Sequence, residues 1–216
     1  PLEYEPGSKV VYSDIGFLVL GWVIEGLVGK PLDLYLARDV YRELGLADDL
    51  FFVRDGDRRQ SQRLMRRAFA ATEDCEWREK LVQGEVHDPN AWILGGVAGH
   101  AGLFAPASEL QVLLRVLLDG GRAADGSPII GSDTVTRFLT PTVEGQALGW
   151  QLPGYAPPGS FGHTGFTGTF VLAVPEQDLS IVLLTNRQNT GVDTNTSYVD
   201  VGPLQRAVVS ALTGVE

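Results

Sequence analysis

Hydroxyl groups, an imidazole and glycines are concentrated in one short segment, His163-Thr164-Gly165-Phe166-Thr167-Gly168-Thr169. The segment stands just before residues 171–174, whose β-branched and apolar side chains are typical of a buried strand. Glycines at the entrance of a strand let a ligand approach the backbone closely. The segment is therefore a candidate ligand site. The alternative is a glycine-rich strand entrance whose threonines are only solvated.

A phenol and a carboxylate stand near the other end of the sequence, in Tyr12-Ser13-Asp14. A phenol has a pKa of about 10, so Tyr12 can act as a base near neutral pH only if a neighbouring cation stabilises its phenolate. Ser13 and Asp14 can cap a helix over residues 15–28 that stops at Gly29. The alternative is that Tyr12 is a core tyrosine and that Asp14 is only a cap.

Two further histidines, His87 and His100, lie in a glycine-rich stretch. We expect both to order the loop by hydrogen bonds to backbone carbonyls. A metal site could be drawn from His87, Asp88, His100 and Cys75, but their spacing fits no tight ligand motif. The sequence therefore predicts neither a metal nor another cofactor.

Helices and strands occur in an order that predicts an α+β protein. Residues 171–174 and 180–185 form a strand pair joined by a short turn, and residues 148–152 form a further strand. Residues 70–104 are expected to be an irregular loop. Helices are predicted at residues 15–28, 32–44, about 106–118, 132–139 and 204–212. We expect one domain over residues 1–216, with an antiparallel sheet flanked by helices.

The bulk composition excludes several classes of protein. A net charge of −10 argues against a nucleic-acid partner, and a single cysteine rules out a disulfide framework. No apolar run reaches membrane-spanning length. The helix at residues 15–28 is apolar on nearly every face, which is typical of a core helix. The arginine-rich residues 54–67 are a solvated face, or alternatively a rim that attracts carboxylate ligands.

Several motifs together resemble the penicillin-recognising serine acyl-enzymes, which include class C β-lactamases, DD-peptidases and related esterases. Tyr12-Ser13-Asp14 resembles their second motif and His163-Thr164-Gly165 their third. The residues between them, His87-Asp88-Pro89-Asn90-Ala91 and Leu94-Gly-Gly-Val-Ala-Gly-His-Ala-Gly-Leu-Phe104, are similar to a branch linked to bacterial cell-wall recycling. The resemblance covers nearly the whole chain and implies the β-lactamase/transpeptidase-like fold.

The resemblance also implies roles for individual residues. In that family a serine attacks a carbonyl and forms an acyl-enzyme that water releases. Tyr12 then takes part in proton transfer, Asp14 stands where asparagine is common, and His163 stands where many relatives have lysine. We expect the substrate to be bound by Thr164, Gly165, Phe166 and Thr167, with the Phe166 backbone N–H at the oxyanion.

The serine nucleophile of that family is missing from the sequence. Its motif is Ser-x-x-Lys, but the residues three positions before Lys9, Lys30 and Lys80 are Pro6, Leu27 and Trp77. No Gly-x-Ser-x-Gly elbow is present either. We therefore expect the nucleophile to lie upstream of Pro1 and the chain to be the C-terminal part of a hydrolase, inactive alone. Apolar faces that meet the missing part should then be exposed or covered by a partner.

The expected substrate is an amide or ester, such as a peptidoglycan fragment or a β-lactam. One alternative is a binding module of the same fold that has lost catalysis, and another is a hydrolase that uses a metal at the loop histidines. The substrate, oligomeric state and compartment are left open, with a location outside the cytoplasm slightly favoured.

Overall fold

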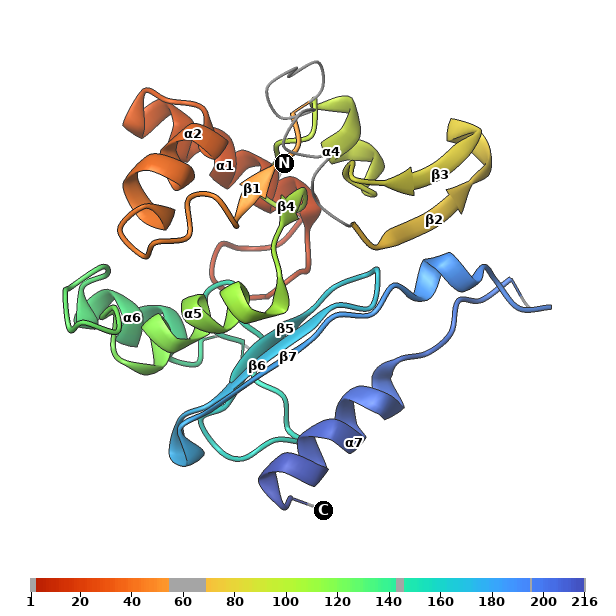
Figure 1. Cartoon of the computed structure of the whole chain (residues 1–216). Helices are drawn as coiled ribbons and strands as arrows, with labels where there is room; N and C mark the ends of the chain where they lie inside the picture. Colours follow the sequence, from red (N-terminus) through yellow and green to blue (C-terminus); the bar gives the residue numbers. More distant parts are fainter. Residues whose placement is uncertain (1–2, 55–68, 143–145, 195, 216) are drawn as a thin grey trace. The chain divides into compact units, whose positions relative to one another are not determined.

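The computed structural model describes residues 3–54, 69–142, 146–194 and 196–215, and its elements confirm the α+β prediction (Figure 1). Its described strands form small antiparallel sheets. Contacts divide the chain into two compact units. The sheet unit comprises Pro1–Tyr12, Leu110–Leu184 and Val201–Glu216, and the loop unit comprises Ser13–Glu109 and Thr185–Asp200. The expectation of a single domain stays a prediction.

The sheet unit is built on a three-stranded antiparallel sheet in the order β5-β6-β7, with β5 at Phe161–Thr164, β6 at Phe170–Val174 and β7 at Leu179–Leu183. Helix α7 (Gly202–Thr213) covers one face and helix α5 (Ala107–Leu118) the other (Figure 1). Because side chains alternate along a strand, β6 is buried on both faces.

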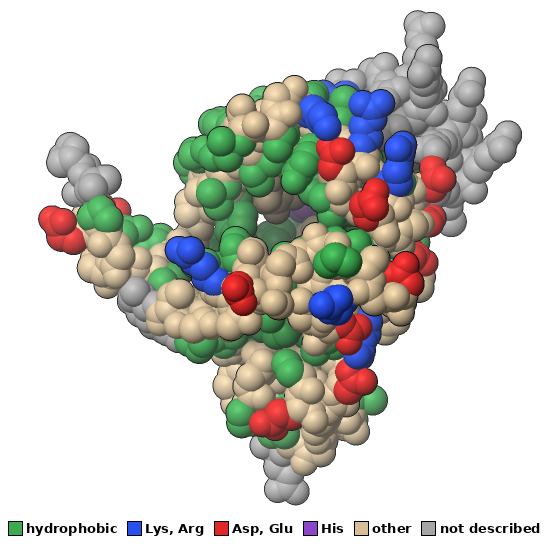
Figure 2. All heavy atoms as spheres, turned by 90° about the vertical axis from the view of Figure 1, so that its left-hand side faces the viewer, with side chains coloured by type: hydrophobic (Ala, Val, Ile, Leu, Met, Phe, Trp, Pro, Cys, Tyr) green, Lys and Arg blue, Asp and Glu red, His purple; other side chains and the backbone are tan. Residues whose placement is uncertain are grey.

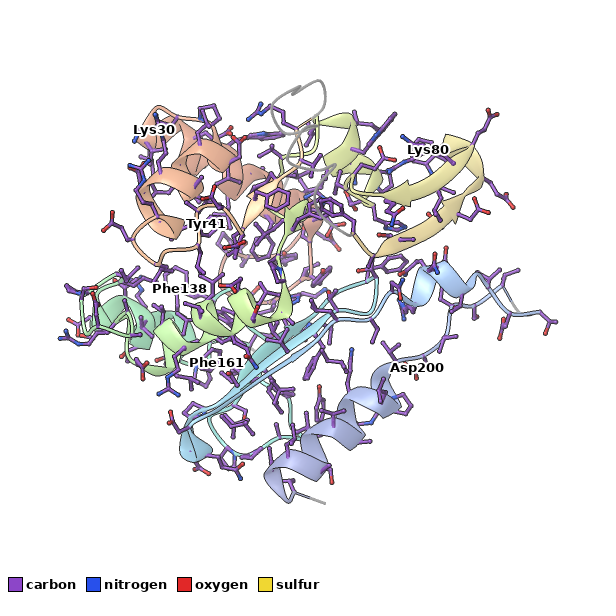
Figure 3. The ribbon with its side chains drawn as sticks, in the orientation of Figure 1. Lys30, Tyr41, Lys80, Phe138, Phe161 and Asp200 are labelled. Carbon is purple, nitrogen blue, oxygen red and sulfur yellow. The ribbon has the colours of Figure 1, made fainter. Side chains whose placement is uncertain are left out.

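The two faces of β6 have separate apolar clusters. Leu172 packs in one cluster with Val209 of α7, and Ala173 packs in the other with Leu114 of α5 and with Phe161 of β5. Phe161 points into this packing and is labelled in Figure 3. Burial of β6 on both sides fixes its register, and that register pairs His163 of β5 with Val171. Helix α6 (Ser132–Leu139) also belongs to this unit.

The loop unit is organised around helix α1 (Asp14–Val28), which ends at Gly29 with a positive φ of 64°. A short helix, α2 (Leu32–Tyr35), continues as a π-helical segment over Leu36–Tyr41. The remaining elements are the pair β1 (Phe51–Phe52) and β4 (Leu103–Phe104), the hairpin β2 (Ala71–Cys75) and β3 (Lys80–Gln83), and the short helix α4 (Pro89–Ile93).

The backbone of the glycine-rich loop lies directly against α1. A β-carbon built on Gly99 would stand 2.1 Å from the carbonyl oxygen of Phe17, and one built on Gly21 would stand 3.4 Å from the Gly99 nitrogen. No side chain fits at Gly99, so glycine is required there for the close approach. The contact places the residues next to Gly99 beside the first turns of α1.

Most predicted helices are confirmed to within two residues. They are observed at Asp14–Val28, Ala107–Leu118, Ser132–Leu139 and Gly202–Thr213, and the predicted hairpin is formed by β6 and β7. The helix expected at residues 32–44 is α2 with its π-helical continuation.

Two local predictions are wrong. The strand expected at residues 148–152 is reduced to one bridge between Gln151 and Gly162, because a loop rich in proline and glycine follows at once. The loop expected at residues 70–104 contains β2, β3, α4 and β4. Its hairpin was missed because Glu73, Asp74 and Glu76 are atypical of strands and their turns.

The expectation that α1 is buried as a core helix is wrong for most of its side chains. Only Leu18 and Gly21 of this helix are buried, and Leu27 is 82% exposed. Hydrophobic side chains also reach the surface on the face drawn in Figure 2. The large apolar side chains of α1 that are exposed to solvent include Ile15, Val19, Leu20, Trp22, Val23 and Leu27.

Among the described residues, no single helix is long and apolar enough to cross a membrane. Helix α1 and the helical segment Leu32–Tyr41 together meet a test of length and composition, but they are bent by 63°.

We expect Gly99→Ala to lower the free energy of unfolding by roughly 1–3 kcal/mol, because its methyl group overlaps the Phe17 carbonyl. The matched control is Gly26→Ala, where a β-carbon meets nothing within 4 Å inside α1. That change should raise the same free energy by up to about 1 kcal/mol through helix propensity. Urea denaturation measures both, and equal effects of the two alanines would contradict the close approach of the loop.

Candidate active site

The structure brings Tyr12 and His163 together within the sheet unit. The centroids of their rings are 6.2 Å apart, with 33° between the ring planes. Tyr12 is 75% exposed, so the reading of Tyr12 as a core tyrosine is wrong. The buried tyrosine is instead Tyr41, and burial raises the pKa of Tyr41 to about 12. Tyr12 is thus accessible to a ligand beside the imidazole.

The tautomer of His163 follows from its hydrogen bond. Its Nδ1 lies 2.7 Å from the carbonyl oxygen of Thr164, and a carbonyl oxygen can only accept. Nδ1 therefore carries a proton, and in the neutral ring Nε2 offers a lone pair. The imidazole donates from Nε2 only when it is protonated.

A tight turn follows His163 and joins β5 to β6. The Gly165 N–H donates to the Thr169 carbonyl over 2.7 Å, and the Gly168 N–H donates to the Gly165 carbonyl over 2.9 Å. A β-carbon on Gly165 would lie 2.1 Å from the Thr169 hydroxyl, so a larger residue there would displace the Thr169 side chain. The turn leaves Phe166 65% exposed at its tip, next to an exposed Thr167.

Thr164 completes the candidate site at the end of β5. Its hydroxyl stands 3.5 Å from the side-chain amide of Gln151. A hydrogen bond of this length is weak. Both side chains are partly buried. The structure thus places the His163, Thr164, Gly165, Phe166 and Thr167 group at one end of the sheet, and their assignment to substrate binding stays a proposal.

Asp14 belongs to the loop unit and does not cap α1. The helix begins at Asp14 itself, and the Ser13 hydroxyl accepts the cap hydrogen bond from the Gly16 N–H at 3.1 Å. The prediction that Asp14 only caps a helix beginning at residue 15 is therefore wrong. Its carboxylate lies instead with Asp88 and His100, in a group whose potential ligand atoms are all within 4.8 Å of one another.

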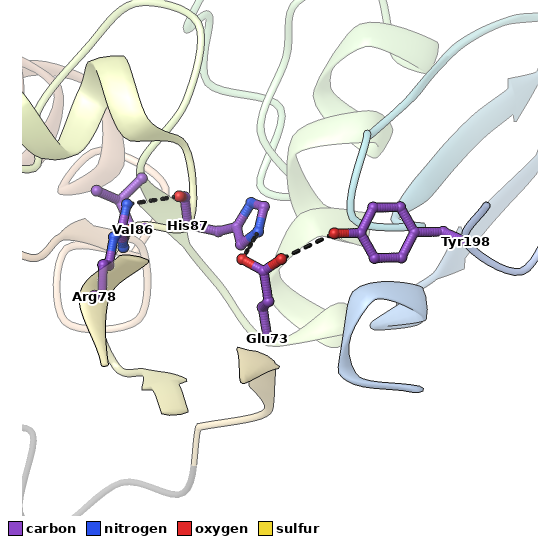
Figure 4. Close-up of polar contacts among 5 residues, drawn as sticks. All are labelled: Glu73, Arg78, Val86, His87 and Tyr198. Carbon is purple, nitrogen blue, oxygen red and sulfur yellow. Dashed lines mark hydrogen bonds and ion pairs between the residues drawn. The ribbon is translucent and has the colours of Figure 1, made fainter. Parts of the chain in front are cut away.

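His87 belongs to a separate network, which Figure 4 shows. Its Nε2 lies 3.0 Å from Glu73 Oε2, and the Tyr198 hydroxyl donates to Glu73 Oε1 over 2.9 Å. His100 Nε2 lies 2.8 Å from Asp88 Oδ1. The expectation that His100 bonds a backbone carbonyl is wrong, because its partner is a carboxylate, and the Nε2 contact of His87 is with a carboxylate as well. The metal set that joined His87 to His100 is likewise not brought together.

Arg78 holds the segment that carries His87. Its guanidinium donates to the carbonyls of Val86 and His87 over 2.8 Å each (Figure 4). It also stacks against Trp77 and Trp92, 4.7 Å and 5.0 Å from the ring centroids. This contact fixes the backbone directly before Asp88, the N-cap of α4.

All three lysines have other partners. Lys30 lies 2.7 Å from Asp39, Lys80 lies 2.8 Å from Glu85, and Lys9 stands 5.6 Å from the Tyr4 ring centroid. Lys30 and Lys80 are labelled in Figure 3. In the arginine-rich run, Arg54 pairs with Asp33 at 2.6 Å, and the rest of the proposed rim lies outside the described residues.

Two features of the site were missed in the sequence. The Glu73–His87–Tyr198 network joins residues far apart in the chain, and no local sequence pattern predicts it. One sequence feature could have indicated that Asp14 approaches His100. It is the run of glycines around His100, which is typical of close backbone packing.

A family model and the sequences of two known proteins match most of this chain. The model of the family described as Beta-lactamase matches residues 1–201. An N-acetylmuramyl-L-alanine amidase of Bacillus subtilis (strain 168) is 37% identical over 216 residues, with 89% of this chain and 47% of that protein covered. A protein of Escherichia coli (strain K12), assigned by its name to the D-alanyl-D-alanine carboxypeptidases, is 35% identical over 210 residues and covers 89% and 48%.

A solved structure supports the fold. The octameric penicillin-binding protein homologue from Pyrococcus abyssi superimposes with a TM-score of 0.65 at 17% identity, over 99% of this chain and 44% of that one. The chain thus spans about half the length of the curated relatives it matches.

The Glu73 carboxylate predicts a pH dependence of stability. Burial raises the pKa of Glu73, but hydrogen bonds from Tyr198 and His87 and the charge of His87 outweigh it, so the net pKa lies below the usual value. A lowered folded-state pKa stabilises the fold above the unfolded pKa, and this contribution is lost as the pH falls through the folded pKa. Glu73→Gln should therefore be less stable than the wild type near neutral pH, by about 1 kcal/mol.

The difference should shrink towards zero as the pH falls below the unfolded-state pKa of glutamate and through the lower folded-state pKa of Glu73. Urea denaturation at several pH values measures it. The control is Glu76→Gln, an exposed glutamate in the turn of the same hairpin, for which we expect a small difference at every pH. A Glu73→Gln difference that stays constant as the pH is lowered from neutral into the acid range would argue against a charged, bonded Glu73.

Proposed function

Because the chain belongs to the Beta-lactamase family, whose hydrolases are of the serine type, we propose that it is the C-terminal part of an acyl-transferring hydrolase. The family assignment confirms the resemblance drawn from the motifs. The proposed substrate is an amide bond in a peptidoglycan fragment. A β-lactam or an ester remains the alternative substrate class.

One observation carries this proposal: Tyr12 and His163, from opposite parts of the sequence, stand with ring centroids 6.2 Å apart. A phenol can take the proton of an attacking serine only if a cation stabilises its phenolate. His163 supplies such a cation when its ring is protonated. When the ring is neutral, its Nε2 can accept a hydrogen bond from the Tyr12 hydroxyl, which orients the phenol but leaves its proton in place.

The proposed reaction follows from these groups. The Tyr12 phenolate takes the serine proton while the serine oxygen attacks the amide carbon. The Phe166 N–H donates to the developing oxyanion, and the protonated Tyr12 returns its proton to the leaving amine as the C–N bond breaks. Water then attacks the acyl-enzyme ester and releases the acid. Thr164 offers a hydroxyl to the substrate, and Asp14 a carboxylate to a neighbouring cation.

Peptidoglycan enters the proposal through the named relatives. A D-alanyl-D-alanine carboxypeptidase and an N-acetylmuramyl-L-alanine amidase both hydrolyse amide bonds next to alanine residues. The two names differ in the bond cleaved, so they support the substrate class and not one particular bond. His163 stands where many relatives have lysine and Asp14 where asparagine is common, and these two departures weigh against a true β-lactamase activity.

The attacking serine is proposed to come from outside these residues. Its motif is absent from the sequence, and the three lysines are held in other contacts. The apolar surface of α1 would be covered by the part of the protein that supplies it. The chain by itself is therefore proposed to be inactive.

The purified 216-residue chain should not be labelled by a fluorescent penicillin or by a fluorophosphonate, because both reagents acylate or phosphonylate an activated serine. Gel fluorescence and intact mass spectrometry measure the labelling, and a serine hydrolase of known activity serves as the positive control. Stoichiometric modification of any serine in this chain would overturn the proposed division of the site.

Acetyl-D-alanyl-D-alanine should bind beside His163 even when no serine is present. We expect the dipeptide to shift the side-chain NMR signals of His163, while the signals of His87, which lies in the other unit, stay in place. The variant Thr164→Val keeps the shape of the side chain and removes its hydroxyl, so it should weaken the response. Equal shifts of both histidines, or none at His163, would contradict a ligand site at the end of β5.

A further inference from the structure

Two carboxylates and an imidazole of the loop unit converge in a group of which the proposed acyl transfer uses only Asp14. The group consists of Asp14, Asp88 and His100, with one potential ligand atom of each within 4.8 Å of the others. They come from three separate places: the first residue of α1, the N-cap of α4 and the loop before β4. Such convergence from distant parts of the chain points to a built arrangement.

Each residue is held in place by the backbone around it. Ser13 takes the capping role at α1, which leaves the Asp14 carboxylate unused. Asp88 Oδ1 accepts a hydrogen bond from the Ala91 N–H at 2.8 Å, and Arg78 fixes the chain just before Asp88. Gly99, packed against the Phe17 carbonyl, sets the position of His100.

The three side chains have free capacity to bind a ligand. Within the described residues, the Asp14 side chain forms no hydrogen bond or ion pair, and the contacts of Asp88 use only Oδ1. The His100 side chain is 5% exposed, and its Nε2 faces Asp88 Oδ1 at 2.8 Å. Nε2 is therefore the ring nitrogen on the side of the Asp88 carboxylate, and an ion bound there takes the place of its proton.

We propose that Asp14, Asp88 and His100 bind one divalent transition-metal ion, with Zn²⁺ the ion that fits best. Two carboxylates near each other repel, and a cation between them removes that repulsion. Imidazole nitrogen and carboxylate oxygen are both ordinary zinc ligands, and three protein ligands leave a coordination position open. Mg²⁺ and Ca²⁺ fit less well, because they favour sets made of oxygen alone.

The ion would join three parts of the loop unit. It would connect the start of α1 to the cap of α4 and to the glycine-rich loop, so its binding would stabilise the folded chain. Asp14 also lies two residues after Tyr12 in the sequence, so the ion would hold one end of the segment that carries the phenol. This inference does not depend on a serine nucleophile, and its failure would leave the proposed acyl transfer untouched.

The experiment uses the 216-residue chain after removal of metals with a chelator. Titration with Zn²⁺ in a calorimeter should show one ion per chain. The side-chain NMR signals should show His100 shifting at one equivalent, and the other two histidines, His87 and His163, provide internal controls. Metal analysis of the protein before chelation gives a further measure of occupancy.

Two variants test the ligands without removing the imidazole. Asp14→Asn and Asp88→Asn remove one charge each and should each weaken Zn²⁺ binding by about tenfold or more. Asparagine still caps a helix, so Asp88→Asn should keep α4 folded, which circular dichroism checks. The matched control is Glu73→Gln, which removes a carboxylate beside His87 and should leave Zn²⁺ binding unchanged.

Three results would overturn the proposal. The first is no saturable Zn²⁺ binding by the chelated chain. The second is binding that shifts His87 or His163 in place of His100. The third is affinity in Asp14→Asn and Asp88→Asn that equals the wild type.

Discussion

The close approach of Gly21 in α1 and Gly99 in the loop before β4 controls the geometry of the loop unit. A backbone can lie this near a helix only where side chains are absent, so the contact is specific to one register of loop and helix. That register places His100 beside Asp14 and, through the buried Ala98, adds to the cluster that contains Leu18 and Ala91. The polar group and the apolar core thus depend on the same contact.

The sequence predicted those elements whose signals are local. Gly29 ends α1 because glycine accepts the left-handed conformation, and the pattern around β6 and β7 follows from their apolar residues. The sequence could not show the exposure of α1, because an apolar helix looks the same whether its cover lies in the same chain or elsewhere. Nor could it show the partner of His87, since Glu73 approaches His87, and Tyr198 approaches Glu73, only after folding.

The residues of the candidate site were predicted from the sequence, but their contacts and hydrogen bonds were not. The pairing of Tyr12 with His163 could be inferred only from the resemblance, since nothing in the spacing of two residues so far apart fixes their distance. The tautomer of His163 depends on a backbone carbonyl that the side chain meets in the fold. The role of Ser13 as the cap likewise depended on where the first turn of α1 begins, which patterns give only to within a residue or two.

The two departures from the motif residues, Asp14 for asparagine and His163 for lysine, shift charge in the same direction. The first adds a negative charge, and the second replaces a lysine ammonium with a ring that is charged only when it is protonated. The rest of the chain does not offset this added negative charge, because the net charge of the whole chain is −10. A local cation is the direct physical remedy, because a charge held close to carboxylates acts far more strongly than distant ones screened by salt. The cluster of Asp14, Asp88 and His100 has the ligand atoms to hold one, and this connects the unusual second motif to the glycine-rich loop that packs against it.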